Sequence, residues 1–197
     1  MKSYIANLLC TLFAALALFD SEVAKAEPVS ANERIPVDIR RVTFVVRDID
    51  KSLALYRDTL GLKVIYDQKI GGGVDEEGKP IAPSVRLVLL QANDTFIGAL
   101  GLMQRLKGEQ APPQELAKAG PRQMIMVINI SDLEDRWPKI LATPYIKIET
   151  TPKRIEYPAP GGGKIPVLFS AVSDADGNFI ELNKLLGQPA GTKQLGE

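Results

Sequence analysis

The stretch "DIDKSLALYRDTLGLKV", residues 48–64, predicts a helix that leads directly into a β-strand. Asp48 is a favoured N-cap residue, and Gly61 is the residue type at which many helices end. Between these two residues the apolar side chains recur at helical spacing, at Ile49, Leu53, Tyr56 and Leu60. The β-branched residues that follow Gly61 favour a strand.

β-strands are predicted on both sides of this helix. One strand precedes it, "RRVTFVV" at residues 40–46, and three follow it, at residues 62–68, 84–91 and 95–103. Their content of β-branched residues is typical of strands. The order of elements in this part of the chain is therefore βαβββ.

The same order is predicted a second time. Strands are expected at residues 123–130, 145–151, 166–173 and 178–184, with a helix at residues 131–141 that begins with a capping box of Ser131 and Glu134. Pairing "DTFIGAL" with "GNFIELN" aligns Phe96 with Phe179 and Gly98 with Glu181. Glycine triplets at 71–73 and 161–163 fall in the same connection of each unit. A repeat of this kind predicts an internal duplication.

The start of the chain has the pattern of a secretory signal peptide. Lys2 precedes an apolar run at residues 8–19, and Ala24-Lys25-Ala26 fits a cleavage site. The run is shorter than the roughly 20 residues that span a bilayer. We therefore expect an exported protein, periplasmic or secreted, after cleavage near Ala26. The expected division is a signal peptide (1–26), a lead-in arm (27–37), a first module (38–105), a linker (106–121), a second module (122–185) and a flexible tail (186–197).

The composition excludes several classes of function. Lys and Arg total 24 and Asp and Glu total 24, so no net charge attracts nucleic acid or anionic lipid. The chain has no histidine, which is the usual general base and the commonest transition-metal ligand. Its single cysteine, Cys10, lies in the predicted signal peptide. Histidine-based and thiol-based mechanisms are therefore excluded for the processed protein.

The two βαβββ units, the stretch at residues 48–64 and the strand "DADGNFIEL" at residues 174–182 resemble the vicinal oxygen chelate superfamily. This superfamily includes glyoxalase I, extradiol dioxygenases, fosfomycin-resistance enzymes and bleomycin-binding proteins. The resemblance covers roughly residues 38–184. It implies an α+β fold in which two tandem βαβββ modules form a cup-shaped, partly open β-barrel with the helices outside.

The resemblance also identifies the positions at which metal-using members hold a divalent ion. Four inward residues, from the first and fourth strands of each module, correspond to Arg41, Gly98, Ile125 and Glu181. Only Glu181 has an ordinary metal-ligating side chain, whereas a transition metal typically needs three or more protein ligands. We therefore expect no metal and no other cofactor. A divalent metal at Glu181 is the less favoured alternative.

Arg41 is expected to face Glu181 across the cup. A guanidinium group matches a carboxylate in two parallel hydrogen bonds, so an Arg41–Glu181 pair, or a ligand that bridges them, would stand where the ion would be. In the alternative, Arg41 extends into solvent and Glu181 accepts from a nearby backbone group. The sequence leaves both interpretations open.

Alternation along the strands predicts the face that these residues share. The face would carry Thr43, Val45, Arg86, Val88, Leu90, Phe96, Leu100, Val127, Asn129 and Phe179. A mostly apolar surface with a few polar groups is the usual lining of a small-molecule pocket, although the same residues could fill a core. The candidate ligand-binding residues are Arg41, Thr43, Arg86, Phe96, Gly98, Asn129, Phe179 and Glu181.

These observations favour a protein that binds a small, partly apolar molecule in its β-cup without the usual metal. The alternative is a lyase, isomerase or dioxygenase-like enzyme in which Glu181 is the catalytic residue. A third interpretation is an interaction module that pairs through an exposed strand edge. The expected partner is a small molecule, with neither nucleic acid nor stable membrane insertion after processing. The resemblance adds a homodimer as one candidate assembly, with a cup built within one chain or between two.

Overall fold

The computed structural model describes residues 30–108, 112, 123–159 and 162–187. The predicted signal peptide lies outside the described residues, as do most of the predicted linker and most of the predicted tail. Within the described part of the chain, no helix is long and apolar enough to cross a membrane.

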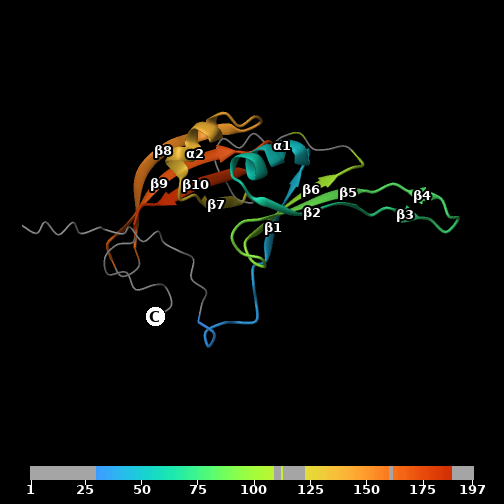
Figure 1. Cartoon of the computed structure of the whole chain (residues 1–197), viewed down its shortest axis with the longest axis horizontal. Helices are drawn as coiled ribbons and strands as arrows, with labels where there is room; N and C mark the ends of the chain where they lie inside the picture. The colour runs from blue at the N-terminus through green and yellow to red at the C-terminus, as the bar shows by residue number, and fades with distance from the viewer. Residues whose placement is uncertain (1–29, 109–111, 113–122, 160–161, 188–197) are drawn as a thin grey trace, which may run out of the picture.

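Two four-stranded sheets with the same strand order form the frame of the molecule (Figure 1). The first sheet has the order β1 (Arg41–Val46), β6 (Ala99–Arg105), β5 (Val85–Gln91) and β2 (Lys63–Ile70). The second has the order β7 (Ile125–Asn129), β10 (Phe179–Leu185), β9 (Lys164–Ser173) and β8 (Lys147–Pro158). In each sheet the first pair of strands is parallel and the others are antiparallel. The predicted α+β class is confirmed, and the two sheets do not close into a barrel.

The helix predicted from residue 48 is present, in two parts. It comprises α1 (Ile49–Leu53) and a π-helical continuation, η1 (Ala54–Thr59). The carboxylate of Asp48 caps it as predicted, because it accepts hydrogen bonds from the backbone N–H groups of Asp50 and Lys51 at 3.0 and 3.3 Å. Gly61 follows with a φ of +83°, which a residue with a side chain rarely adopts.

The second helix, α2 (Leu133–Leu141), begins differently from the prediction. The predicted capping box is wrong, because the N-cap is Asp132 and its side chain makes no capping hydrogen bond. The carboxylate of Asp132 binds the guanidinium of Arg136 instead, one turn along the helix, at 2.6 Å. Pro138 lies inside the helix.

The fourth strand of the first sheet starts later than predicted. The carboxylate of Asp94 accepts hydrogen bonds from the backbone N–H groups of Phe96 and Ile97, at 2.7 and 2.9 Å, and so holds these residues in a turn. Gly98 closes the turn with a φ of +67°, and β6 begins at Ala99. The alignment that paired Gly98 with the second module's carboxylate is therefore wrong by three residues.

The glycine-rich connection between β2 and β5 contains two strands that were not predicted. These are β3 (Gly73–Val74) and β4 (Pro80–Ile81), which pair with each other alone. Figure 1 shows them at the far end of a long hairpin that projects from the first sheet. In the second module, β8 and β9 themselves extend to the corresponding connection, where Pro158 pairs with Lys164.

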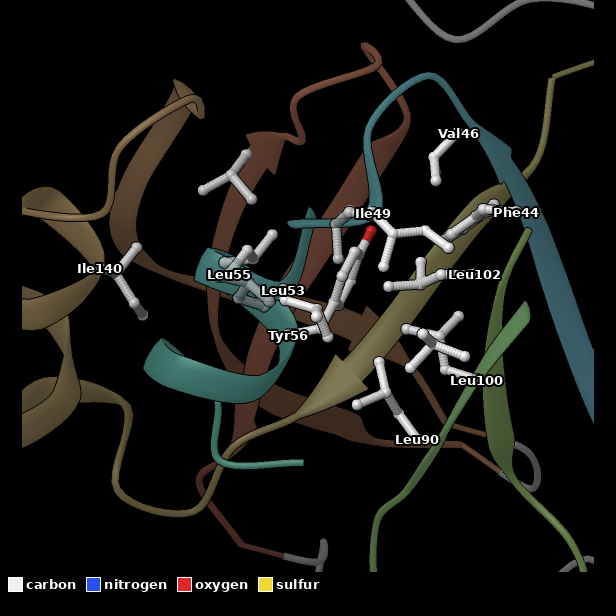
Figure 2. Packing of buried hydrophobic residues seen from close by; sticks show 14 of the residues in the cluster. Phe44, Val46, Ile49, Leu53, Leu55, Tyr56, Leu90, Leu100, Leu102 and Ile140 are labelled. Carbon is white, nitrogen blue, oxygen red and sulfur yellow. The ribbon is translucent and has the colours of Figure 1, made fainter. Parts of the chain in front are cut away.

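One hydrophobic core lies between the helices and both sheets (Figure 2). Its buried members are Phe44, Val46, Ile49, Leu53, Leu55, Tyr56, Val88, Leu90, Leu100, Leu102, Ile130, Leu133, Ile140, Val172, Ile180 and Leu182. For Val88, Leu90 and Leu100 the structure shows the core alternative and not the ligand face. Leu90 pairs with Leu100 in the register of β5 and β6, and both point toward the helices.

Polar contacts between the modules cross this core. The buried hydroxyl of Tyr56 donates to the carboxylate of Asp174, in the turn before β10, at 2.8 Å. Burial, with the negative charge of Asp174, raises the pKa of Tyr56 well above its ordinary value. Arg47 binds the carboxylate of Asp176 in the same turn at 2.7 Å. The β9–β10 turn of the second module is therefore fixed to the first module.

Candidate functional site

Each sheet has a face turned away from the helices, which we call its open face. Because side chains alternate along a strand, the neighbours of core residues point to this face. In β6, Leu100 and Leu102 point to the core, so Ala99, Gly101 and Met103 lie on the open face. Their partners in β1 are Arg41, Thr43 and Val45.

The open face of the first sheet is apolar and closely packed at its centre. Val45 is 57% exposed, and Leu87 and Leu89 of β5 are half-buried. Gly101 lies so near Thr43 that a Cβ atom added to the glycine would come within 2.4 Å of the Thr43 Oγ1 atom. A side chain therefore fits at position 101 only if Thr43 moves.

The open face of the second sheet has a different chemistry. It carries Ile125, Val127 and Asn129 from β7, Phe179, Glu181 and Asn183 from β10, and Phe169, Ala171 and Ser173 from β9. Glu181 stands between Val127 and Ala171 in the register of the three strands. Val127 is 59% exposed, so the β7 side of the carboxylate is open to solvent.

Glu181 has one polar partner among the described residues. Its carboxylate is half-buried and accepts a hydrogen bond from the amide nitrogen of Asn183 at 3.0 Å. Asn183 is only 7% exposed, and its amide oxygen is buried without a hydrogen-bond partner. The pair therefore presents acceptors whose capacity the described residues do not fill.

A second carboxylate of the same sheet is fully compensated. Glu149, in β8, accepts a hydrogen bond from the Ser173 hydroxyl at 2.7 Å and forms an ion pair with Lys147 at 3.1 Å. Unfilled acceptor capacity, as at Glu181, is therefore not a general property of the acidic residues on this sheet.

The predicted Arg41–Glu181 pair is absent from the ion pairs of the described residues. Arg41 is exposed at the start of β1, and Glu181 binds an amide of its own strand. Thr43 lies on the first open face, whereas Asn129 and Phe179 share the second open face with Glu181. The structure thus brings together three of the predicted site residues.

Arg86 lies on the opposite side from the predicted pocket. It follows the same alternation as Val88 and Leu90, so it points to the helix side of β5. There it binds the carboxylates of Asp67 in β2 and Asp50 in α1, at 2.8 and 2.9 Å. Its guanidinium holds the pKa of Asp67 below the ordinary value. The assignment of Arg86 to the ligand face is therefore corrected.

Phe96 and Gly98 lie outside the strands that form the open faces. They belong to the turn before β6, and the ring of Phe96 is 52% exposed beneath the guanidinium of Arg40, 5.1 Å from it. Gly101, not Gly98, corresponds to Glu181, because Ala99 pairs with Arg41 as Phe179 pairs with Ile125.

The four positions implied for a metal are therefore Arg41, Gly101, Ile125 and Glu181. Glycine and isoleucine have no ligating side-chain atom, and arginine keeps its positive charge at all ordinary pH values. Among the residues that the structure describes, no three or more Asp, Glu, His or Cys side chains gather in a way that could hold a metal ion. This donor set does not fit a divalent metal.

Sequence reasoning missed Asn183 and Gly101. Alternation could have found Asn183, but it could not have found Gly101, because that assignment depends on where β6 begins. Asn183 follows Glu181 by two residues in one strand, and Gly101 lies between Leu100 and Leu102. The error at Gly101 came from starting the strand too early.

A family model described as the Glyoxalase/Bleomycin resistance protein/Dioxygenase superfamily matches residues 38–182. No curated protein matches the chain in sequence. Among solved structures, a glyoxalase family protein from Bacillus cereus superposes with a TM-score of 0.56 at 11% sequence identity, over 80% of this chain and 100% of that chain. At this identity the similarity shows the fold.

Two further structures are less similar. The trypanothione-dependent glyoxalase I of Leishmania major has a TM-score of 0.48 and 19% identity, over 75% of this chain and 86% of that chain. An antibiotic binding protein from a Streptomyces species has a TM-score of 0.49 and 15% identity, over 77% of this chain and 99% of that chain. Similarity at this level carries no information about a ligand of this chain.

Proposed function

The chain belongs to the glyoxalase/bleomycin resistance protein/dioxygenase superfamily, and from that premise we propose that it is an exported protein that binds a small, partly apolar molecule. The molecule occupies the open face of the second sheet, around Glu181, without a metal ion. Export rests on the signal-peptide pattern of residues 1–26.

The observation that carries the proposal is an exposed apolar surface around a carboxylate that has no cationic partner among the described residues. Val127 and Ile125 expose more than two fifths of their surface beside Glu181, and the half-buried ring of Phe179 lies on the same face. A soluble protein that exposes a contiguous apolar patch usually covers it with a ligand or a partner. Small-molecule sites combine such a surface with a few placed polar groups.

The absence of a metal is supported by the donor set at the four positions. Arg41, Gly101 and Ile125 offer no ligating atom to an ion, so Glu181 would hold it almost alone. A lone carboxylate does not retain a divalent ion against water. The binding role therefore agrees with the side chains better than a metal-dependent reaction does.

We include a homodimer in the proposal. β1 and β7 each pair with one neighbour only among the described strands, so each is an edge strand of its sheet within the described residues. Val45 on β1 and Val127 on β7 lie exposed beside these edges. A second copy related by a two-fold axis could pair its β7 with β1 of the first copy. The same symmetry would then pair its β1 with β7 of the first copy, so both edges would be covered. Light scattering of the purified protein measures the subunit number directly.

Native mass spectrometry of the protein purified from its own exported fraction tests the binding role. We expect an added organic mass that disappears on denaturation, on a chain shortened near Ala26. A metal mass lost on acidification would contradict the proposal and favour the enzyme alternative centred on Glu181. A bare chain that also binds no added apolar probe would contradict small-molecule binding and favour an interaction module.

A further inference from the structure

We infer that the molecule bound at this face carries a positively charged, hydrogen-bond-donating group, such as an ammonium or amidinium, and that Glu181 receives this group. The inference rests on the proposed function and specifies the chemical class of its ligand. It is drawn from the two unfilled acceptors of the second open face.

The first acceptor is the carboxylate of Glu181. It is half-buried in a strand whose neighbours in the register are Val127 and Ala171, and neither offers a polar side-chain atom. A carboxylate withdrawn from water needs a cation or several donors to replace its hydration. The one amide hydrogen bond that Glu181 receives leaves most of its lone pairs free.

The second acceptor is the amide oxygen of Asn183. It is buried and unpartnered, although nearly all buried polar atoms in proteins have a partner. Rotating the amide by half a turn would not satisfy it, because the oxygen would then face the Glu181 carboxylate and both atoms accept. The pair can therefore be completed only by a donor from outside the described residues.

Three lysines of the second sheet each have a described partner other than Glu181, and one of these partners, Phe169, is itself on the open face. Lys147 pairs with Glu149, Lys184 pairs with Glu134 on the helix side, and the ammonium of Lys153 lies over the ring of Phe169 at 5.7 Å. Arg41 forms no described ion pair with Glu181. The neutralising charge is therefore assigned to the ligand rather than to the described part of this chain.

The surroundings define the rest of the ligand. Phe179 lies beside Glu181 on the open face, and the exposed side chains of Ile125 and Val127 continue the apolar surface along β7. A positive group attached to an apolar body would match this arrangement, because each part meets its complement. An anionic group in the same place would meet the negative charge of Glu181 and the unpartnered oxygen of Asn183.

Calorimetric titration of the full chain at neutral pH tests the inference with three probes of the same length. The probes are n-octylammonium, 1-octanol and octanoate, which have eight carbon atoms each and a positive, a neutral and a negative head group. We expect n-octylammonium to bind about tenfold or more tighter than 1-octanol, and octanoate to bind weakest. In Glu181→Gln the preference for n-octylammonium over 1-octanol should fall to near one.

Glu156→Gln is the matched control, because it removes the same charge from an exposed carboxylate of β8 that pairs with Lys164. This variant should keep the full preference. Equal binding of 1-octanol and n-octylammonium by the unchanged protein would overturn the inference and leave the proposed function intact. Loss of the preference in Glu156→Gln as well would also overturn it, by showing a nonspecific charge effect. Failure of all three probes to bind would contradict the proposed function itself.

Discussion

Position 101 in the first sheet and position 181 in the second are equivalent, yet they hold opposite chemistry. Gly101 packs against Thr43, and the space that a side chain would need is filled. Glu181 instead extends a carboxylate beside the exposed Val127. On the helix side of the same strands, Leu102 and Leu182 are both fully buried leucines. The two modules therefore repeat their core and differ on their open faces, because only the core must satisfy the same packing twice.

The largest expected effect tests whether the two halves of the core are equivalent. Leu102→Ala and Leu182→Ala should each lower the free energy of unfolding by about 2–5 kcal/mol, because each leaves a cavity in a fully buried site. Urea unfolding followed by fluorescence and circular dichroism should give one transition for both variants. Two separate transitions in either variant would show that the modules unfold independently, contrary to a single shared core.

The next substitution gives the first module a carboxylate at the position equivalent to Glu181. Gly101→Glu should cost about 1–3 kcal/mol of unfolding free energy, because the new side chain collides with Thr43. Adding Thr43→Ala should recover part of the loss, as measured by a double-mutant cycle in urea. Gly73→Ala is the control, since a Cβ atom there meets nothing within 4 Å. Strictly additive losses for the two substitutions would refute the steric reason.

The contact between the modules at Tyr56 should have a smaller effect. Tyr56→Phe removes the hydroxyl that donates to Asp174 and should cost about 1–2 kcal/mol of unfolding free energy. The raised pKa of Tyr56 favours the neutral hydroxyl in the folded state. Its contribution is therefore complete below the ordinary tyrosine pKa of 10.0 and is lost as the pH rises above it.

Thermal unfolding between neutral pH and alkaline pH checks this direction. The loss of stability above the ordinary tyrosine pKa should be smaller in Tyr56→Phe than in the unchanged protein. An identical alkaline loss in both proteins would show that Tyr56 does not contribute to it. Tyr157→Phe is the control, because that tyrosine is exposed on β8.

The smallest effect is expected at Arg86, which ties β5 to β2 and α1 on the helix side. Arg86→Gln should cost at most about 1 kcal/mol, because its carboxylate partners are substantially exposed. The pKa of Asp67 is lowered in the folded protein, so its ion pair with Arg86 stabilises the fold at neutral pH. This stabilisation is lost as the pH falls and Asp67 becomes protonated. Octanol binding should not change, and a clear loss of binding would return Arg86 to the ligand site.

The sequence by itself determined the features that depend on neighbouring residues. Asp48 and the spacing of apolar residues after it specified where the first helix begins, because a cap and a helical stripe are local. The recurrence of the same element order specified two units of one α+β fold. The position of Glu181 in the last strand was equally legible, because alternation within a strand needs no other part of the chain.

The tertiary structure alone decided which residues meet. The turn held by Asp94 delays β6, and this delay reverses the face on which Leu100 lies and makes Gly101 the counterpart of Glu181. The pairing of Tyr56 with Asp174 joins residues far apart in the chain. Strand register and the packing of one module on the other depend on such distant contacts, so a shift of one residue changes every face assignment while the local pattern stays the same.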